Sequence, residues 1–182
     1  MPSIYMPLKK IFVFFSTLSL LLSACSAPPS KQVEAQNAIK ALEAKVATNI
    51  ETVDYNLAND LATSYMEYAF KYNDDSLAAN YLFKAASLQK GALGEYKDAI
   101  ETLQNFIKNY PKDQNVPKAY FFIGTIYQDN LKEFGNAQTA YQTYLEKYPN
   151  DTFAKDARIL IENISLTDEE LLKKITQKKD SL

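Results

Sequence analysis

Apolar side chains recur every three or four residues along most of the chain after residue 30. In one segment Ala99, Leu103, Phe106 and Tyr110 fall on a single helical face, with polar residues between them. The same spacing predicts eight helices, with edges defined to about three residues. Their predicted ranges are 31–49, 55–72, 76–90, 95–110, 116–130, 134–148, 152–164 and 167–178. The predicted fold class is therefore all-α.

Residue types that favour helix starts support these boundaries. Asp113 and Asp151 lie where helix N-caps are expected, and Pro117 suits a first helical turn. The run Thr167-Asp168-Glu169-Glu170 reads as a capping box at the start of the last helix.

The chain also repeats itself at a fixed interval. Tyr72, Tyr110 and Tyr148 are equally spaced, and further pairs keep the same spacing. Those pairs are Ala99 with Ala137, Gln104 with Gln142, Pro111 with Pro149, and Asp113 with Asp151. Two units are clear and an earlier one is degenerate. An interval of this size predicts a solenoid of stacked helix pairs.

The residues of the two clear units resemble a known family. In the second unit the matching residues are Ile123-Gly124, Tyr127, Phe134, Ala137, Tyr141 and Tyr148-Pro149, and in the first they are Ala86, Leu93-Gly94, Tyr96, Ala99, Leu103 and Tyr110-Pro111. This pattern resembles the tetratricopeptide repeat, although Gln89 takes a usual Tyr position and Trp is absent. The resemblance covers roughly residues 55–165 and implies an α-α superhelix of about three to three and a half pairs. Gly124 and Ala86 should let paired helices cross closely, against Ala137 and Ala99.

The resemblance also implies where a partner would bind. Such folds bind segments of other proteins through a concave face, lined by first-helix positions beside the packing residues. In this chain those positions are Asn80, Phe83, Ser87, Lys90, Lys118, Phe121, Thr125 and Gln128. Phe83 and Phe121 are expected to be apolar anchors, and an equally weighted alternative makes both of them core residues.

The first thirty residues predict export and lipidation. Lys9 and Lys10 precede an apolar stretch, 11–22, that is shorter than the roughly 20 residues a bilayer requires. Leu22-Ser23-Ala24-Cys25 resembles the bacterial lipobox, which implies a signal peptide at 1–24 and acyl chains on Cys25. Residues 25–30 form the lipidated end and tether, and 31–180 form the repeat domain. Ser26, in place of Asp, favours an outer-membrane, periplasm-facing location.

Composition restricts the chemistry further. The chain has no histidine, one cysteine and a net charge of −2. Usual metal sites and nucleophilic triads need residues that are absent, and no glycine-rich phosphate loop is present. The charge balance also disfavours nucleic acid. We therefore expect no enzyme activity, no cofactor, no metal and no small-molecule substrate.

These features together predict a membrane-anchored, protein-binding scaffold. The lipobox, tether and repeats distantly resemble BamD-type lipoproteins, which implies a role in outer-membrane β-barrel assembly. The alternative is a periplasmic adaptor for cell-wall or division complexes, a class that usually carries a trimeric coiled coil before the repeats. Its candidate heptad residues here are Val33, Ala35, Ile39, Leu42, Val46 and Ile50.

Overall fold

A computed structural model describes residues 29–48 and 54–166, together with positions 173, 176 and 177. The predicted signal peptide, Cys25 and the capping box at 167–170 lie outside the described residues, so their predictions stand untested. Among the described residues, no helix combines the length and apolar character that a bilayer crossing requires.

The described part of the chain is all-α, which confirms the predicted fold class. Every predicted segment from 31 to 164 contains a helix, and the observed ends differ from the predicted ones by a few residues. The helices are α2 (Lys31–Thr48), α3 (Tyr55–Lys71), α4 (Ala78–Leu88), α5 (Tyr96–Asn109), α6 (Val116–Thr125), α7 (Phe134–Lys147) and α8 (Ala154–Ile164). Predicted helix 167–178 falls almost wholly outside the described residues.

The first helix of each clear unit ends in a π-helical turn that the periodicity did not predict. These turns are η2 (Gln89–Leu93), after α4, and η3 (Ile126–Leu131), after α6. Each turn is closed by a left-handed residue, Gly94 with φ 69° and Lys132 with φ 57°. A π turn accommodates an extra residue, which contributes to units longer than the common tetratricopeptide length.

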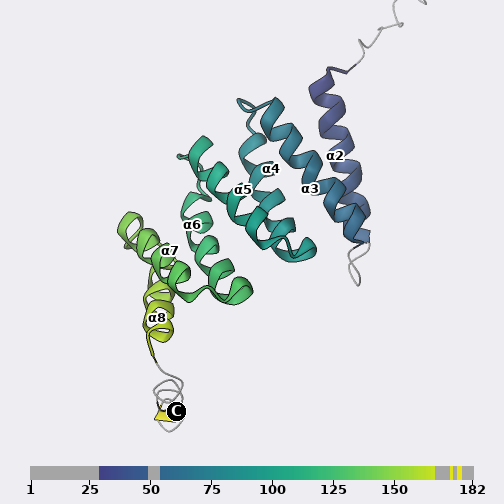
Figure 1. Cartoon of the computed structure of the whole chain (residues 1–182). Coiled ribbons are helices and arrows are strands. Elements are labelled where there is room, and N and C mark those ends of the chain that lie inside the picture. The colour runs from purple at the N-terminus through teal and green to yellow at the C-terminus, as the bar shows by residue number, and fades with distance from the viewer. Residues whose placement is uncertain (1–28, 49–53, 167–172, 174–175, 178–182) are drawn as a thin grey trace, which may run out of the picture.

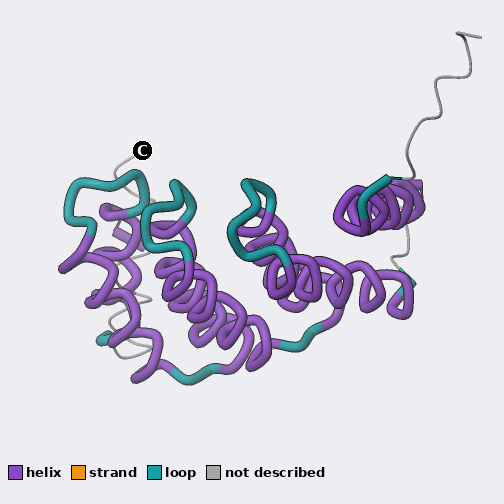
Figure 2. Tube along the Cα trace, turned by 90° about the horizontal axis from the view of Figure 1, so that it is seen from above, coloured by secondary structure: helices purple, strands orange, loops and turns teal. Residues whose placement is uncertain are grey.

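The helices lie side by side in chain order, so that each one packs against its neighbours in sequence (Figure 1). The row turns as it runs from α2 to α8, as the view from above also shows (Figure 2). This arrangement is the superhelix of helix pairs that the repeat predicted. Consecutive pairs are α4 with α5 and α6 with α7, and each pair carries one repeat.

The core consists of three clusters that run along the row. Ile39, Tyr65 and Tyr81 belong to the first cluster, between α2, α3 and α4. The second joins α4, α5 and α6, and the third joins α6, α7 and α8. Because every cluster spans two units, each unit needs its neighbour to bury its apolar face.

Helix α2 uses its apolar side inside this core. Ile39 is fully buried, and Ala35, Leu42 and Val46 pack against the same cluster. These are four of the candidate heptad residues; Val33 is exposed and Ile50 lies outside the described residues. The heptad-like spacing of α2 is therefore explained by contacts within the chain.

The close crossing at Gly124 has a different partner from the predicted one. A methyl group added at Gly124 would meet the buried Tyr141 ring, with 2.6 Å to Cδ1 of Tyr141. The prediction named Ala137 as the neighbour, but the bulkier Tyr141 side chain requires the space. In the first unit the equivalent pair is Ala86 with Leu103, both buried in one cluster. The repeat that has alanine in place of glycine thus has the smaller leucine in place of tyrosine on the facing helix.

Candidate functional site

The structure places the eight predicted groove residues along the first helices of the two repeats. They lie on α4 and η2 (Asn80, Phe83, Ser87, Lys90) and on α6 and η3 (Lys118, Phe121, Thr125, Gln128). Asn80 and Ser87 are exposed, whereas Phe83 and Phe121 are buried and the other four are half-buried. Burial therefore separates the two phenylalanines from the rest.

Phe83 and Phe121 belong to the core. Phe83 is 9% exposed, with its ring centre 5.4 Å from that of Phe106 on α5. Phe121 is 8% exposed and stacks on Phe153, with ring centres 4.8 Å apart. Neighbours from the same chain thus cover both rings, which favours the core alternative over a role as apolar anchors.

Four predicted residues meet between α4 and α6 around a fifth, Phe122. The Lys90 ammonium donates to Thr125 Oγ1 at 3.2 Å and lies 5.1 Å from the Phe122 ring centre. Lys118 reaches the same ring at 5.2 Å and the Phe83 ring at 5.8 Å. The two rings stack at 6.0 Å. We call these five residues the lysine–aromatic cluster.

Phe122 was missed by the sequence reasoning. The repeat predicted Phe121 as a groove residue, because its counterpart in the preceding unit is Phe83. Phe122 instead aligns with Lys84, so that the repeat is broken at this position. The adjacent pair Phe121-Phe122 was the available signal, because a helix can bury both neighbouring rings only on two different surfaces.

The charges around the cluster are unbalanced. Helices α4 and α6 carry lysines and no acidic residue. Lys84 is paired with Glu43 of α2, with Nζ and Oε1 2.7 Å apart. No carboxylate of the described residues pairs with Lys90 or Lys118. The lysine–aromatic cluster is therefore a cationic surface with an aromatic floor, suited to an anionic group.

The Glu43 carboxylate shows how such a lysine is satisfied elsewhere in the fold. Tyr65 donates a hydrogen bond to Glu43 at 2.6 Å, and the Lys84 ammonium also lies over the Tyr65 ring. Burial alone would raise the pKa of Glu43, but the hydrogen bonds from Lys84 and Tyr65 outweigh it, and the pKa is lowered. An acidic partner residue beside Lys90 and Lys118 would reproduce this arrangement.

The remaining predicted residues do not join the cluster. Ser87 donates its hydroxyl hydrogen to the Phe83 carbonyl at 3.0 Å, within its own helix. The buried Gln128 Oε1 has no hydrogen-bond partner within the described residues. Asn80 is exposed and makes no side-chain hydrogen bond in the described structure. Whether these residues contact a partner stays a prediction.

Among the described residues, no group of three or more His, Cys, Asp or Glu side chains could hold a metal ion. The buried polar groups of the core are mainly tyrosine hydroxyls. Burial, together with hydrogen bonding to Asp151, raises the pKa of Tyr144, which fits a structural role for this group.

Residues 81–113 and 118–151 each match the tetratricopeptide repeat family. These two segments have tetratricopeptide-repeat character. Both matches coincide with the observed helix pairs, and the lysine–aromatic cluster lies between their first helices. Repeats of this family generally mediate binding between proteins, and proteins built from them are typically scaffolds. No curated protein matches the chain in a sequence comparison.

Proposed function

We propose that this protein is a lipid-anchored scaffold of the cell envelope that binds an acidic segment of a partner protein. The observation that carries the proposal is the lysine–aromatic cluster. Lys90 and Lys118 both approach the Phe122 ring, from consecutive repeats, and neither has a carboxylate partner among the described residues. A segment that lies across α4 and α6 would contact both repeats at once.

The proposed contact combines charge and apolar surface. A partner Asp or Glu side chain would accept charge-assisted hydrogen bonds from the two ammonium groups, which are stronger than neutral ones. The half-buried position of both lysines reduces solvent screening, so each contact gains more than an exposed ion pair would. Asn80 and Ser87 are both exposed on α4 and would bind polar groups of the segment beside its carboxylate.

The envelope location rests on the sequence of the first thirty residues. The lipobox at 22–25 and the proline-containing tether support acylation of Cys25. Ser26 supports transport to the outer membrane, with the repeats facing the periplasm. Participation in β-barrel protein assembly is the specific role proposed. The adaptor alternative gains no structural support, because α2 uses its apolar side within the chain.

Affinity capture of the full-length protein from gently crosslinked membranes tests the scaffold. The variant Lys90→Glu with Lys118→Glu reverses the cluster charge, and Lys97→Glu with Lys108→Glu makes the same change at exposed positions of α5. Wild type and control should capture the same acidic-segment proteins, including β-barrel assembly components, and the cluster variant should lose them. Equal capture by the cluster variant would refute the site.

Lipidation is tested separately from binding. Cells supplied with labelled palmitate should label the wild-type protein and leave the Cys25→Ala variant unlabelled, because only the cysteine of a lipobox is acylated. A wild-type protein without label would contradict the anchor while leaving the repeat surface unaffected.

A further inference from the structure

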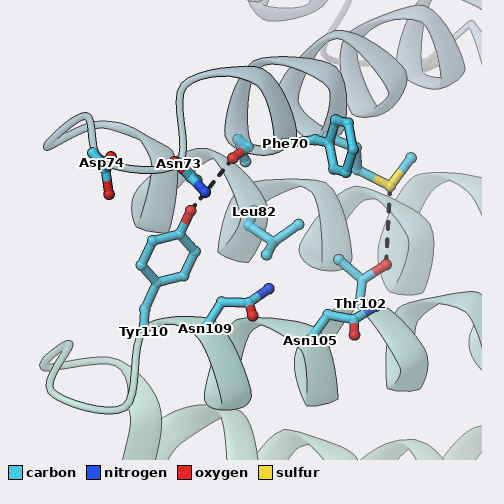
Figure 3. A pocket seen from close by; sticks show the side chains of 10 residues that line it. Phe70, Asn73, Asp74, Leu82, Thr102, Asn105, Asn109 and Tyr110 are labelled. Atoms are coloured by element: carbon cyan, nitrogen blue, oxygen red, sulfur yellow. Dashed lines mark hydrogen bonds between the residues drawn. The ribbon is translucent and has the colours of Figure 1, made fainter.

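A second open surface lies between α3 and α5, where the second helices of neighbouring pairs face each other. Its cavity of about 650 Å³ is lined by residues that include Met66, Phe70, Asn73, Leu82, Asn105 and Asn109. Figure 3 shows Asn105 and Asn109 on α5, with Phe70 and Asn73 across from them and Leu82 between. We call it the α3–α5 groove. It shares no residue with the lysine–aromatic cluster.

Phe70, at the rim of the groove, is the most exposed large apolar residue of the described chain. Its side chain is 90% exposed, although neighbouring Ala69 is buried in the core. Leaving a phenylalanine ring in water forgoes the free energy that its burial would contribute. Phe70 shares the cavity lining with Met66 and Leu82, and contiguous apolar surface of this kind marks a site where another molecule binds.

Three asparagine side chains of the groove have no hydrogen-bond partner within the described structure. The carboxamides of Asn73, Asn105 and Asn109 make no hydrogen bond to any described residue, and all three are exposed. Each carboxamide can donate and accept at once. A peptide group offers the complementary N–H and C=O, so these amides suit the backbone of another chain.

The spacing of the amides fits an extended backbone. Asn105 and Asn109 are one helical turn apart, which places them about 6 Å apart along the helix axis. Equivalent peptide groups of an extended chain recur every second residue, about 6.6 Å apart. A segment that runs along α5 could therefore pair alternate peptide groups with the two amides.

The floor of the groove is apolar apart from the Thr102 hydroxyl, which donates to the Met66 sulfur at 4.0 Å. Met66 and Leu82 line it between the helices, and the Tyr110 hydroxyl donates to the Ala69 carbonyl at 3.4 Å across one end. Side chains of an extended segment alternate between its two sides. Every second side chain would thus point towards Leu82, and an apolar one would contact both the floor and the Phe70 ring.

The charged side chain that lines the groove is acidic. Asp74 lines it, and burial together with this carboxylate raises the pKa of Tyr110, which places the charge close by. Asp98 in the first turn of α5 and Glu95 just before that helix add two carboxylates, and Glu95 accepts a hydrogen bond from Tyr55 of α3 at 2.9 Å. No lysine or arginine lines the cavity among the described residues. A cationic occupant is favoured.

We infer that the α3–α5 groove binds an extended segment of another protein, with an apolar side chain flanked by basic residues. The segment lies along α5, pairs its backbone with Asn105 and Asn109, and covers Phe70. Its charge is opposite to that of the segment proposed for the lysine–aromatic cluster. The scaffold would thus hold two chemically distinct segments at two surfaces that share no residue.

Selection from a displayed library of random dodecapeptides on the full-length protein in mild detergent tests this inference. Peptides with an apolar residue between lysines or arginines should be enriched. Fluorescence anisotropy then measures their affinity for Asn105→Ala with Asn109→Ala, and for Phe70→Ser. We expect about tenfold weaker binding or more for each variant, because two hydrogen bonds or the apolar contact are lost.

A matched control removes two exposed amides outside the groove, Gln104→Ala with Gln142→Ala, and should bind like the wild type. The variant Lys90→Glu with Lys118→Glu should also bind these peptides normally, so that failure here and failure of the proposed function are distinguishable. Selection of acidic peptides, no enrichment, or equal binding by the Asn105/Asn109 variant would overturn the inference. So would a wild-type dimer that Phe70→Ser converts to monomer, since a second copy would then fill the groove.

Discussion

Replacement of Gly124 by alanine should lower the free energy of unfolding by about 2 kcal/mol. The added methyl group would lie 2.6 Å from Cδ1 of Tyr141, closer than carbon atoms approach without displacement. The Tyr141 ring is fully buried and packs against Phe121, so it has no free space to enter. Overpacking of a core by one methyl group costs typically about 1–3 kcal/mol.

The helix propensity of alanine opposes this cost. Alanine in place of glycine stabilises a helix interior by about 1 kcal/mol. The clash here is severe and involves a rigid ring, so we take about 3 kcal/mol for the overpacking, the upper end of that range. The difference between the two effects leaves a net loss of about 2 kcal/mol.

The chain itself offers the compensating change. The first repeat places Ala86 and Leu103 where the second places Gly124 and Tyr141. The double variant Gly124→Ala with Tyr141→Leu recreates the pair of the first repeat. Its loss of stability should be about 3 kcal/mol smaller than the sum of the two single losses, because the overpacking is absent once the ring is removed and the helix propensity of alanine remains.

Urea unfolding followed by circular dichroism at 222 nm measures all four proteins of this cycle, with an unchanged slope as the check for a comparable transition. Gly135→Ala is the control, because nothing lies within 4 Å of a methyl group at Gly135. It should be neutral or stabilising. The reasoning would be refuted if Gly124→Ala were as stable as Gly135→Ala, or if the two changes were additive.

Two further predictions concern the turns and the Glu43 pair. Lys132→Gly should raise the melting temperature, because a non-glycine residue at φ 57° costs about 1 kcal/mol. Gly94→Ala should lower the melting temperature, because it introduces a similar cost at φ 69°. A lower melting temperature for Lys132→Gly, or a higher one for Gly94→Ala, would contradict this. The lowered pKa of Glu43 means that its pair with Lys84 stabilises the fold above the ordinary pKa of 4.5 and is lost as the pH falls through the lowered value. Glu43→Gln should therefore cost up to about 1 kcal/mol at pH 7, limited by solvent screening, and close to nothing at pH 3; an equal cost at both pH values in urea unfolding would contradict the assignment.

The helices were predictable because their signal is strong at every position. Ala99, Leu103 and Phe106 recur at helical spacing, and the repeat confirms the same face twice. The π turns were not predictable, since the regular helical period cannot represent an inserted residue. Gly94 gave a hint of the left-handed end of the first repeat, but Lys132 at the equivalent position gave none.

The site was predictable in part. Lys90, Lys118 and Thr125 were expected in the groove, and the structure brings them together. Phe122 escaped notice because the repeat aligns it with Lys84. The α3–α5 groove gave no sequence signal, because Phe70 and Asn105 resemble ordinary surface residues of their own helices. Only packing around Leu82 brings these residues to one cavity.

Site-specific photocrosslinking in living cells tests the central claim most directly. A photoreactive phenylalanine analogue at exposed Ser87, on the helix that carries Phe83, should crosslink a partner protein through an acidic segment. The crosslink should disappear when Lys90 and Lys118 are changed to Glu, and the same analogue at Gln142 should give no such product. A Ser87 crosslink that persists in the charge-reversed protein, or no crosslink at all, would contradict the account.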